Sequence, residues 1–570
     1  MKPLDFFQYV AFLLIVAVLV VPVGNYLARV FSGETTFLSR ILRPAEKALY
    51  RLMGVSADQE MDWKSYTYSF LAFSLIGTIL LYALLRLQYL LPGGPEAKYL
   101  VTPLTPDLSL NTAISFSTTT TWQAYGGETT MRYWTQMLGL AAQNFMAAAG
   151  GLAVGFAFLR GFVRQRTSSL GCFWVDLTRA LLYVLLPLAF IGSLALVFLG
   201  VPQNFMPYVE ASTIEGGSQI IAQGPVAALE LIKNLGTNGG GFFNVNGAHP
   251  YENPTPLTNL IEMLAIAVLP AGFVYTFGKL LDRPRLGWTL LGVMFTLFAA
   301  GLLICGTAEQ GGIPQVAALG VSGGNMEGKE VRFGIGGSVL TAITTSNGAT
   351  GSYNSMHDSF TPIGGLVPLI NMLLGEIVFG GLGTGLYSMI MIALVGLFLA
   401  GLMVGRTPEF VGKTIGPPEV KLILLYSLVG PGTVLLLTAL AVTTPGGLAG
   451  LTTNSGPHGF SEILYGYASS MANNGQNMAG LSANTPFYNF TMAIAMMAGR
   501  FALAIPALAL ASHLAVQGRR PTTVGTLPTD TLQFGVIVLG TAIIVGALSF
   551  LPALAIGPIV EQLKMIGSLR

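Results

Sequence analysis

Ten apolar stretches of about 20 residues or more dominate the 570-residue sequence. A helix of about 20 apolar residues crosses the hydrocarbon core of a bilayer. Only 9% of the residues are Asp, Glu, Lys or Arg, against about 25% in an average soluble domain, which excludes a water-soluble globular enzyme. We therefore predict an all-α polytopic membrane protein whose ten transmembrane helices lie at 6–28, 67–91, 133–159, 179–200, 257–281, 286–306, 364–404, 419–442, 487–514 and 531–556.

The seventh stretch, 364–404, is too long for one straight crossing. It contains the run Phe379-Gly380-Gly381-Leu382-Gly383-Thr384-Gly385, which we expect to divide it into two pieces. Non-helical backbone at membrane depth is tolerated only where it is buried in protein or lines a water-filled cavity. This stretch therefore predicts a broken helix in the interior of the protein.

The basic residues predict the orientation in the membrane. Of the 28 Lys and Arg residues, 18 lie in the connections 29–66, 160–179, 279–285, 405–421 and 515–530, and only 8 lie on the opposite side. Loops rich in Lys and Arg stay in the cytoplasm. We expect the first stretch to be a true span rather than a removable signal, and an even number of spans then places both termini outside.

The four longer outer segments each contain a short apolar stretch followed by a polar cluster. Apolar stretches of 10–14 residues are typical of half-helices that enter the membrane and turn back. The expected half-helices are Leu108–Thr118, Pro225–Leu235, Ile335–Thr345 and Phe460–Met471. The clusters are Thr119-Thr120-Thr121-Trp122-Gln123, Thr237-Asn238-Gly239-Gly240, Ser346-Asn347-Gly348-Ala349 and Asn473-Asn474-Gly475-Gln476.

These features repeat along the chain in the order span, half-helix, polar loop, span. Thr-Pro opens the span after three of the clusters, as expected for proline in the first helical turn. Four units of one orientation do not make an inverted-repeat transporter; they favour a pseudo-fourfold pore. The predicted divisions are an N-terminal span and loop (1–66), four pore repeats (67–160, 161–282, 283–405 and 406–515) and a C-terminal span (516–570).

The clusters offer uncharged oxygen atoms and contain no carboxylate. A ring of backbone carbonyls and hydroxyls can replace the hydration shell of a monovalent cation, whereas Ca²⁺ and Mg²⁺ sites normally use carboxylates. Gly, Asn and Thr also form plain turns, but four such clusters at matching places favour an ion filter. K⁺ is the only metal ion that we expect.

Four segments resemble the A subunit of the Kdp-type ATP-driven potassium importers, and the likeness extends over essentially the whole chain. They are STTTTWQAYGGE (Ser117–Glu128), NLGTNGGGFFN (Asn234–Asn244), NGATGSYNSMHDSFTP (Asn347–Pro362) and YASSMANNGQN (Tyr467–Asn477). The resemblance implies the fold of the superfamily of potassium transporters. It also implies that the four clusters form a K⁺ selectivity filter. The family usually has Asn where this chain has Thr119 and Thr121.

The resemblance further implies partners. K⁺ would pass sideways through a tunnel into the catalytic B subunit, a P-type ATPase that uses ATP and Mg²⁺. A single-span C subunit and a small F peptide would complete the complex. Its location would be the bacterial cytoplasmic (inner) membrane, among membrane lipids. This chain lacks an Asp-Lys-Thr-Gly sequence, so we expect no ATP hydrolysis by it alone, and its balanced charge gives no sign of nucleic-acid binding.

Other residues have two interpretations. Arg500 lies within the ninth span, where a charge is costly, and we expect it to limit or steer the ion path below the filter; the alternative is snorkelling to the interface. Gly380, Gly381 and Gly383 resemble a gate-like interruption, or else pack helices together. Glu376 and Glu262 could each pair with a cation or a polar loop. The histidines, His249, His357, His458 and His513, show no metal-ligand spacing, and we expect structural roles for them.

Two alternatives to a pump component remain. A self-sufficient potassium channel or channel-like uptake system would share the filter and need no ATPase. An intramembrane enzyme would need clustered acidic or His residues near a membrane face, and the sequence shows no such cluster.

Overall fold

The computed structural model describes residues 2–405, 408–521 and 526–567. Within these residues ten helices are long and apolar enough to cross a membrane, which confirms the predicted number. They are α1 (Pro3–Phe31), α3 (Trp63–Leu87), η3 with α6 (Thr135–Ala141, Ala142–Val163), α7 with η4 and α8 (Phe173–Arg179, Ala180–Leu185, Leu186–Phe198), α10 (Pro256–Leu280), α11 (Pro284–Gly311), α15 (Thr384–Val404), α16 (Pro417–Thr443), α19 with η7 and α20 (Pro486–Met497, Ala498–Ala502, Leu503–Val516), and α21 with η8 and α22 (Leu532–Leu554, Ala555–Ile559, Val560–Met565).

Four short helices match the predicted half-helices. They are α4 (Pro106–Ser117), α9 (Val226–Leu235), α13 (Gly334–Asn347) and α18 (Gly456–Ala472). Most of their residues are buried, on all sides rather than along one stripe, and each leads directly into one of the polar clusters. The order long helix, short helix, loop, long helix therefore occurs four times between α3 and α20.

The Thr-Pro pairs begin helices as the sequence predicts. The side-chain oxygens of Thr255, Thr361 and Thr485 accept hydrogen bonds from backbone N–H groups three residues later, at 3.2, 3.2 and 3.4 Å. Proline follows each of them in the first helical turn, where its missing N–H group has no intrahelical partner to lose.

The seventh stretch is broken, but earlier than the glycine run predicts. Helix α14 (Pro362–Leu373) ends six residues before the run that begins at Phe379, and α15 begins only at Thr384. Residues 374–383 between them are non-helical, and Gly375, Glu376, Phe379 and Gly383 have positive φ angles. Thr384 and Gly385, which the sequence placed in the break, form the first turn of α15. We call residues 374–383 the break.

In each of the four groups, the long helix after the loop is more buried than the one before it. In the most apolar segment of each span, 83% of the residues of α6 are buried but only 22% of those of α3. The buried share is 67% in α10 against 28% in α8, and 61% in the span that contains α20 against 22% in α16. For α15 and α11 the shares are 56% and 50%. The helices that follow the loops therefore form the interior; α3, α8 and α16, which precede loops, face mostly outward, whereas α11 is half buried.

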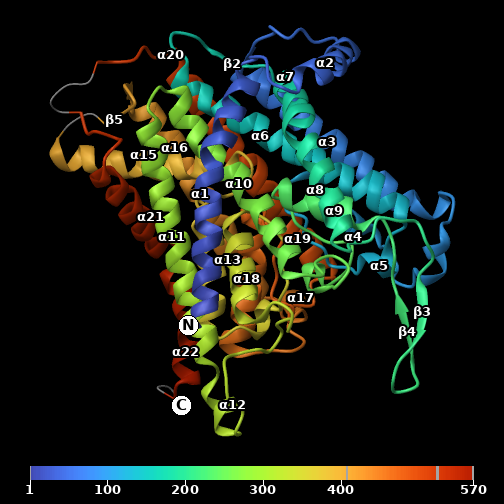
Figure 1. Cartoon of the computed structure of the whole chain (residues 1–570). Helices are drawn as coiled ribbons and strands as arrows, with labels where there is room; N and C mark the ends of the chain where they lie inside the picture. The colour runs from blue at the N-terminus through green and yellow to red at the C-terminus, as the bar shows by residue number, and fades with distance from the viewer. Residues whose placement is uncertain (1, 406–407, 522–525, 568–570) are drawn as a thin grey trace.

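Figure 1 shows that the start of α1 and the end of α22 lie at one end of the molecule, with α2 (Ser39–Met53) at the other. Helix α2 exposes both Ile41 and Leu52 and carries four basic residues, which is typical of a helix lying on a membrane surface. The described part of the chain also contains three short two-stranded sheets between helices, which the sequence analysis did not predict: β1–β2 (Met61–Asp62, Ser169–Gly171), β3–β4 (Val209–Ser212, Ser218–Ile221) and β5–β6 (Glu409–Phe410, Lys413–Thr414).

Candidate functional site

The four short helices end in the same way. The backbone N–H groups of Thr120, Asn238, Thr350 and Asn474 each donate to the carbonyl oxygen five residues earlier, at 2.9–3.1 Å. The residue before each of them, Thr119, Thr237, Ala349 or Asn473, has a left-handed φ between 49° and 65°. These shared features define four equivalent loops: loop 1 (Thr119–Gln123), loop 2 (Thr237–Gly241), loop 3 (Ala349–Ser352) and loop 4 (Asn473–Gln476).

By these shared features, loop 3 begins three residues later in the sequence than predicted, at Ala349 instead of Ser346. Ser346 and Asn347 belong to the last turn of α13, where the side-chain amide of Asn347 donates to the carbonyl of Ile343 at 2.9 Å. Gly348 caps that helix. The sequence analysis matched Asn347-Gly348 with Asn238-Gly239 because both read Asn-Gly. In the structure, Thr350-Gly351 is the pair that corresponds to Asn238-Gly239.

Loop 2 contacts loop 1 on one side and loop 3 on the other. The hydroxyl of Thr121 donates to the carbonyl of Asn238 at 2.6 Å, and the side chain of Gln123 forms hydrogen bonds with the backbone of Gly241 in both directions. Toward loop 3, Gly240 N–H donates to the carbonyl of Gly351 at 3.2 Å, and Gly351 N–H donates to that of Asn238 at 3.3 Å.

Loop 4 closes the ring. A Cβ atom at Gly351 would lie 2.7 Å from the carbonyl oxygen of Asn474, and one at Gly475 would collide with the carbonyl oxygen of Thr120. The side chain of Asn473 donates to the hydroxyl of Thr120 at 2.9 Å. Each loop thus touches two others, in the cyclic order 1-2-3-4, so segments from four distant parts of the chain surround one axis.

Two glycines with positive φ lie where the backbones of neighbouring loops meet. Gly239 (φ 93°) contacts the backbone of Gly351, and Gly475 (φ 90°) contacts that of Thr120. A side chain at either place would be strained by the positive φ and would push two loops apart. Thr119 and Thr121 of loop 1 also have positive φ, 65° and 49°, which is unfavourable for a β-branched residue.

Three predicted filter residues, Trp122, Gln123 and Gln476, contact side chains or backbone around the ring and hold the loops in place. The indole of Trp122 is only 2% exposed and packs in the apolar cluster formed with α18 and α19. Gln123 joins loops 1 and 2, as described above. The side chain of Gln476 accepts a hydrogen bond from Tyr465 at 3.0 Å and donates to the hydroxyl of Thr345.

A carboxylate lies behind loop 4, although the loops themselves contain none. Oε1 of Glu376, a buried residue of the break, accepts a hydrogen bond from the side-chain amide of Asn474 at 2.7 Å. This contact confirms the expectation that Glu376 could pair with a polar loop. The carboxylate holds Asn474, whose amide also donates to the carbonyl of Thr345 at 3.0 Å.

The break lies next to loops 2 and 3. The N–H of Leu382 donates to the hydroxyl of Thr237 at 3.0 Å, and a Cβ at Gly381 would be 2.9 Å from that of Ala349. On its other side, Gly383 packs on the backbone of α6 at Gly151 and Gly155. The glycines therefore allow the break to fit between the loops and α6.

Arg500 is buried at the level of the break. Its guanidinium donates to the carbonyl of Ala147 on α6 at 2.9 Å and lies 5.5 Å from the centre of the Phe70 ring. A Cβ at Gly151 would lie 3.2 Å from it. Within the described residues no carboxylate comes within 4 Å of this guanidinium and its Nε atom has no hydrogen-bond partner. It thus places an uncompensated positive charge in the interior.

A buried ion network anchors loop 2. The ammonium of Lys233 on α9 lies 2.7 Å from carboxylate oxygens of both Glu230 and Glu252, and all three side chains are at most 1% exposed. The other carboxylate oxygen of Glu252 accepts the N–H of Phe243 at 2.8 Å. The network therefore connects α9 with the chain on the far side of loop 2.

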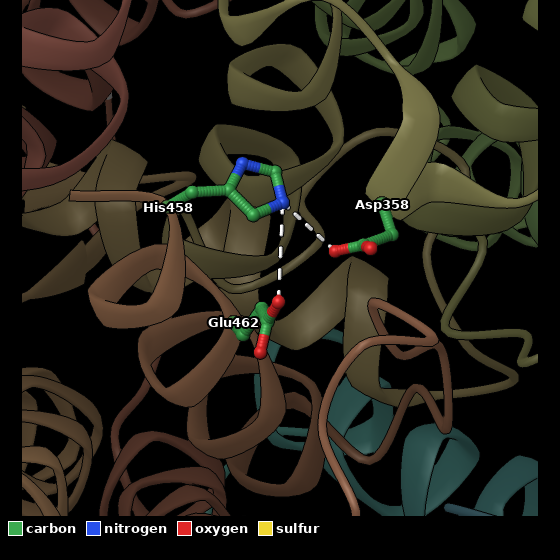
Figure 2. Close-up of side chains that lie close together, drawn as sticks. All are labelled: Asp358, His458 and Glu462. Carbon is green, nitrogen blue, oxygen red and sulfur yellow. Dashed lines mark hydrogen bonds and ion pairs between the residues drawn. The ribbon is translucent and has the colours of Figure 1, made fainter. Parts of the chain in front are cut away.

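A second polar cluster, which the sequence analysis missed, brings together Asp358, His458 and Glu462 (Figure 2). Nε2 of His458 lies 2.8 Å from Asp358 and 3.9 Å from Glu462, and Nδ1 lies 2.7 Å from Glu561. Hydrogen bonds with Asp358 and Glu561 raise the pKa of His458 to about 10. The spacing of His458 and Glu462, four residues apart on one helix, was the available signal; Asp358 is 100 residues away.

Comparison with known proteins decides the family. The model of the family described as "Potassium-transporting ATPase A subunit" matches residues 10–563. The chain belongs to this family. A relative from Methylobacterium nodulans, named potassium-transporting ATPase potassium-binding subunit, is 52% identical over 96% of this chain and 95% of its own. One of the same name from Solibacter usitatus is 51% identical over 98% of each chain.

The fold has a counterpart among solved structures. The potassium transporter TrkH from Vibrio parahaemolyticus matches with a TM-score of 0.50 at 14% sequence identity, over 77% of this chain and 83% of that one. At that identity the likeness concerns the fold. It places this member of the potassium-transporting ATPase A subunit family in the architecture that the sequence analysis predicted.

Proposed function

We propose that loops 1 to 4 form a K⁺ selectivity filter. The observation that carries this proposal is the closed cycle of contacts among four backbone-rich, carboxylate-free loops, each at the C-terminal end of a buried short helix. Carbonyl and hydroxyl oxygens of such loops can replace the water around a monovalent cation. The partly negative C-termini of the four helices add attraction for it.

The filter residues in this proposal follow the structural register. They are Thr119, Thr120 and Thr121 of loop 1, Thr237, Asn238, Gly239 and Gly240 of loop 2, Ala349, Thr350 and Gly351 of loop 3, and Asn473, Asn474 and Gly475 of loop 4. Ser346, Asn347 and Gly348 support loop 3 from the end of α13. Trp122, Gln123 and Gln476 hold the loops against their neighbours.

The chain would act as the ion-selecting component of an ATP-driven importer; its relatives are named potassium-binding subunits of a potassium-transporting ATPase, which supports this role. It would bind K⁺ at the outer face and pass it to the catalytic B subunit, a P-type ATPase. That partner would use ATP and Mg²⁺, and a single-span C subunit and an F peptide would complete the complex in the bacterial inner membrane. Both termini of this chain would lie outside, and the four groups of helices would be the four pore repeats of the predicted boundaries.

Arg500 and the break would control the path below the filter. A cation that leaves the filter toward the cytoplasm meets the break, supported by Gly380, Gly381 and Gly383, and then the positive charge of Arg500. Charge repulsion in a low-dielectric interior is strong. The direct path would therefore be blocked to unassisted flow, which favours a sideways exit to the partner.

The test is purification of the complex from native membranes with an affinity tag on this chain. We expect a P-type ATPase to co-purify, ATP hydrolysis to rise with K⁺ but not with Na⁺, and ATP-driven ⁸⁶Rb⁺ uptake in proteoliposomes. The chain alone should give no comparable flux. Rapid ⁸⁶Rb⁺ flux through the chain alone would favour the channel alternative and contradict the pump assignment.

A further inference from the structure

Three carboxylates surround one imidazole at the end of the molecule where α22 lies. Asp358 belongs to the short helix η6 (His357–Ser359), His458 and Glu462 to α18, and Glu561 to α22. His458 is the only cationic partner within 4 Å of any of the three carboxylates in the described part of the chain. Even with a protonated imidazole, the cluster therefore carries an excess of negative charge.

Among the three carboxylates, that of Glu462 is the most deeply buried, so its negative charge is the least favourable. Its side chain is 0% exposed. Oε1 faces Nε2 of His458 at 3.9 Å and accepts a hydrogen bond from Asn454 at 2.6 Å, while Oε2 is buried without a hydrogen-bond partner among the described residues. A buried carboxylate is unfavourable unless it is paired or coordinates a metal. Oε2 points away from His458 (Figure 2), but Oε1 points toward Nε2 at a separation beyond hydrogen-bond distance, so within the described residues this buried carboxylate has no cation in contact on the side that faces Asp358 and His458.

The three inward-facing atoms have the arrangement of a divalent metal site. Nε2 of His458 and carboxylate oxygens of Asp358 and Glu462 all lie within 4.8 Å of one another. Ligand atoms around a tetrahedral zinc ion, each about 2.0–2.2 Å from it, are about 3.3 Å apart. The observed separations of 2.8 and 3.9 Å from Nε2 lie on either side of that value, and the two carboxylate oxygens lie within 4.8 Å of each other, so side-chain movements of an ångström or so would bring all three atoms to one ion.

Glu561 supplies the second feature of such sites. Metal-binding histidines usually give the proton of their other ring nitrogen to a carboxylate, which fixes the ring and increases its basicity. Nδ1 of His458 lies 2.7 Å from Glu561, on the side of the ring opposite the three-atom group. The side chains of His458 and Asp358 are 20% and 15% exposed, so two of the three ligands lie partly at the surface, where an ion from solution can reach them.

We propose that Asp358, His458 and Glu462 bind one divalent transition-metal ion of the Zn²⁺ class, with Glu561 as the orienting carboxylate. An imidazole ligand with carboxylates favours Zn²⁺ over Ca²⁺ and Mg²⁺, which prefer oxygen ligands alone. On binding, the ion takes the place of the Nε2 proton, which is released to solvent. The ion joins η6, α18 and α22, and so braces the short helix that ends in loop 4. This site is independent of the K⁺ filter.

The test is metal binding by the full-length chain in detergent after removal of metals with EDTA. Calorimetry with ZnCl₂ should give one site per chain, and the heat measured in buffers of different ionisation enthalpy should show proton release. Zn²⁺ should raise the thermal unfolding temperature, with Mg²⁺ and Ca²⁺ giving much smaller shifts. CoCl₂ should produce the visible absorption bands of a four-coordinate Co²⁺ ion.

Matched variants assign the site. His458→Gln, Asp358→Asn and Glu462→Gln should each weaken Zn²⁺ binding at least tenfold and remove the Co²⁺ bands. Glu561→Gln should weaken binding about 10–100-fold, as loss of an orienting carboxylate does. His513→Gln is the control, because His513 lies on α20 beside Glu419, and it should bind as the unmodified chain does. The proposal is wrong if the unmodified chain shows no saturable Zn²⁺ binding, or if Asp358→Asn and Glu561→Gln, as folded proteins, bind as tightly as it does.

Discussion

At the scale of single residues, Gly475 shows how the loops depend on close backbone approach. Gly475→Ala places a methyl group against the carbonyl of Thr120 at a φ of 90°, and therefore separates loops 4 and 1. We expect the K⁺-over-Na⁺ preference of uptake to fall at least tenfold. Competition between ⁸⁶Rb⁺ and Na⁺ measures it.

The control is Gly540→Ala on α21, where a new Cβ meets no described atom within 4 Å. This change should leave selectivity intact, because alanine is also the better helix former. Equal selectivity in Gly475→Ala and Gly540→Ala would remove the basis for the ring.

Thr119 stores local strain that a different residue would relieve. Asn tolerates the left-handed region far better than a β-branched residue does. Among the described residues the hydroxyl of Thr119 donates only to the adjacent carbonyl of Thr118, at 2.5 Å, so little folding stability is lost on its removal. Thr119→Asn should raise the free energy of unfolding by about 0.5–1 kcal/mol. Thermal unfolding in detergent tests this, and a destabilised variant would contradict it.

His249 gives the protein a dependence on acid pH. Burial lowers the pKa of His249, and Nδ1 accepts the N–H of Tyr251 at 3.1 Å, which requires the neutral ring. The histidine therefore takes up a proton more readily in the unfolded chain than in the folded one. The contribution of the neutral, buried ring to the free energy of unfolding is fully present above about pH 6.5 and is lost as the pH falls below that value.

The comparison is with His249→Gln, which cannot titrate. The stability advantage of the unmodified chain over this variant should shrink between pH 7.5 and pH 5 in thermal unfolding. An advantage that stays constant across that range would mean that His249 does not carry the effect.

At the scale of elements, the Lys233 network decides whether α9 presents loop 2. Lys233→Met leaves Glu230 and Glu252 buried without their cation, and we expect a loss of about 3–5 kcal/mol in the free energy of unfolding. The matched control is Lys98→Met, because Lys98 pairs with Glu210 at 3.3 Å while both side chains are more than 60% exposed. It should cause no measurable change. Similar unfolding temperatures for both variants would contradict this account.

The elements also show where sequence reasoning succeeds and where it stops. Apolar length predicted all ten spans, and Thr255, Thr361 and Thr485 marked helix starts, because both signals are local. The register of loop 3 differs from the predicted one because Asn347-Gly348 imitates the motif of loop 2 while α13 continues two residues beyond its predicted end at Thr345. Helix length there depends on packing: the hydroxyl of Ser346 accepts a hydrogen bond from Asn371 of α14 at 2.9 Å.

At the scale of the whole molecule, four distant segments form one ring of contacts, whereas the sequence shows only that they repeat along the chain. The cyclic contacts of loops 1 to 4 and the greater burial of the helices that follow them are properties of the folded chain. The Asp358–His458 contact joins residues 100 positions apart, so no local pattern revealed it. The composition excluded a soluble enzyme, but the partner that would supply energy lies outside this chain.

The proposed filter is tested most directly by the anomalous scattering of Rb⁺ or Tl⁺ in crystals of the complex, since both ions are substitutes for K⁺. We predict a peak on the axis of the ring, within coordination distance of oxygen atoms from all four loops. A peak that touches residues of only one or two loops, or one that lies away from Thr120, Asn238, Thr350 and Asn474, would contradict the shared site.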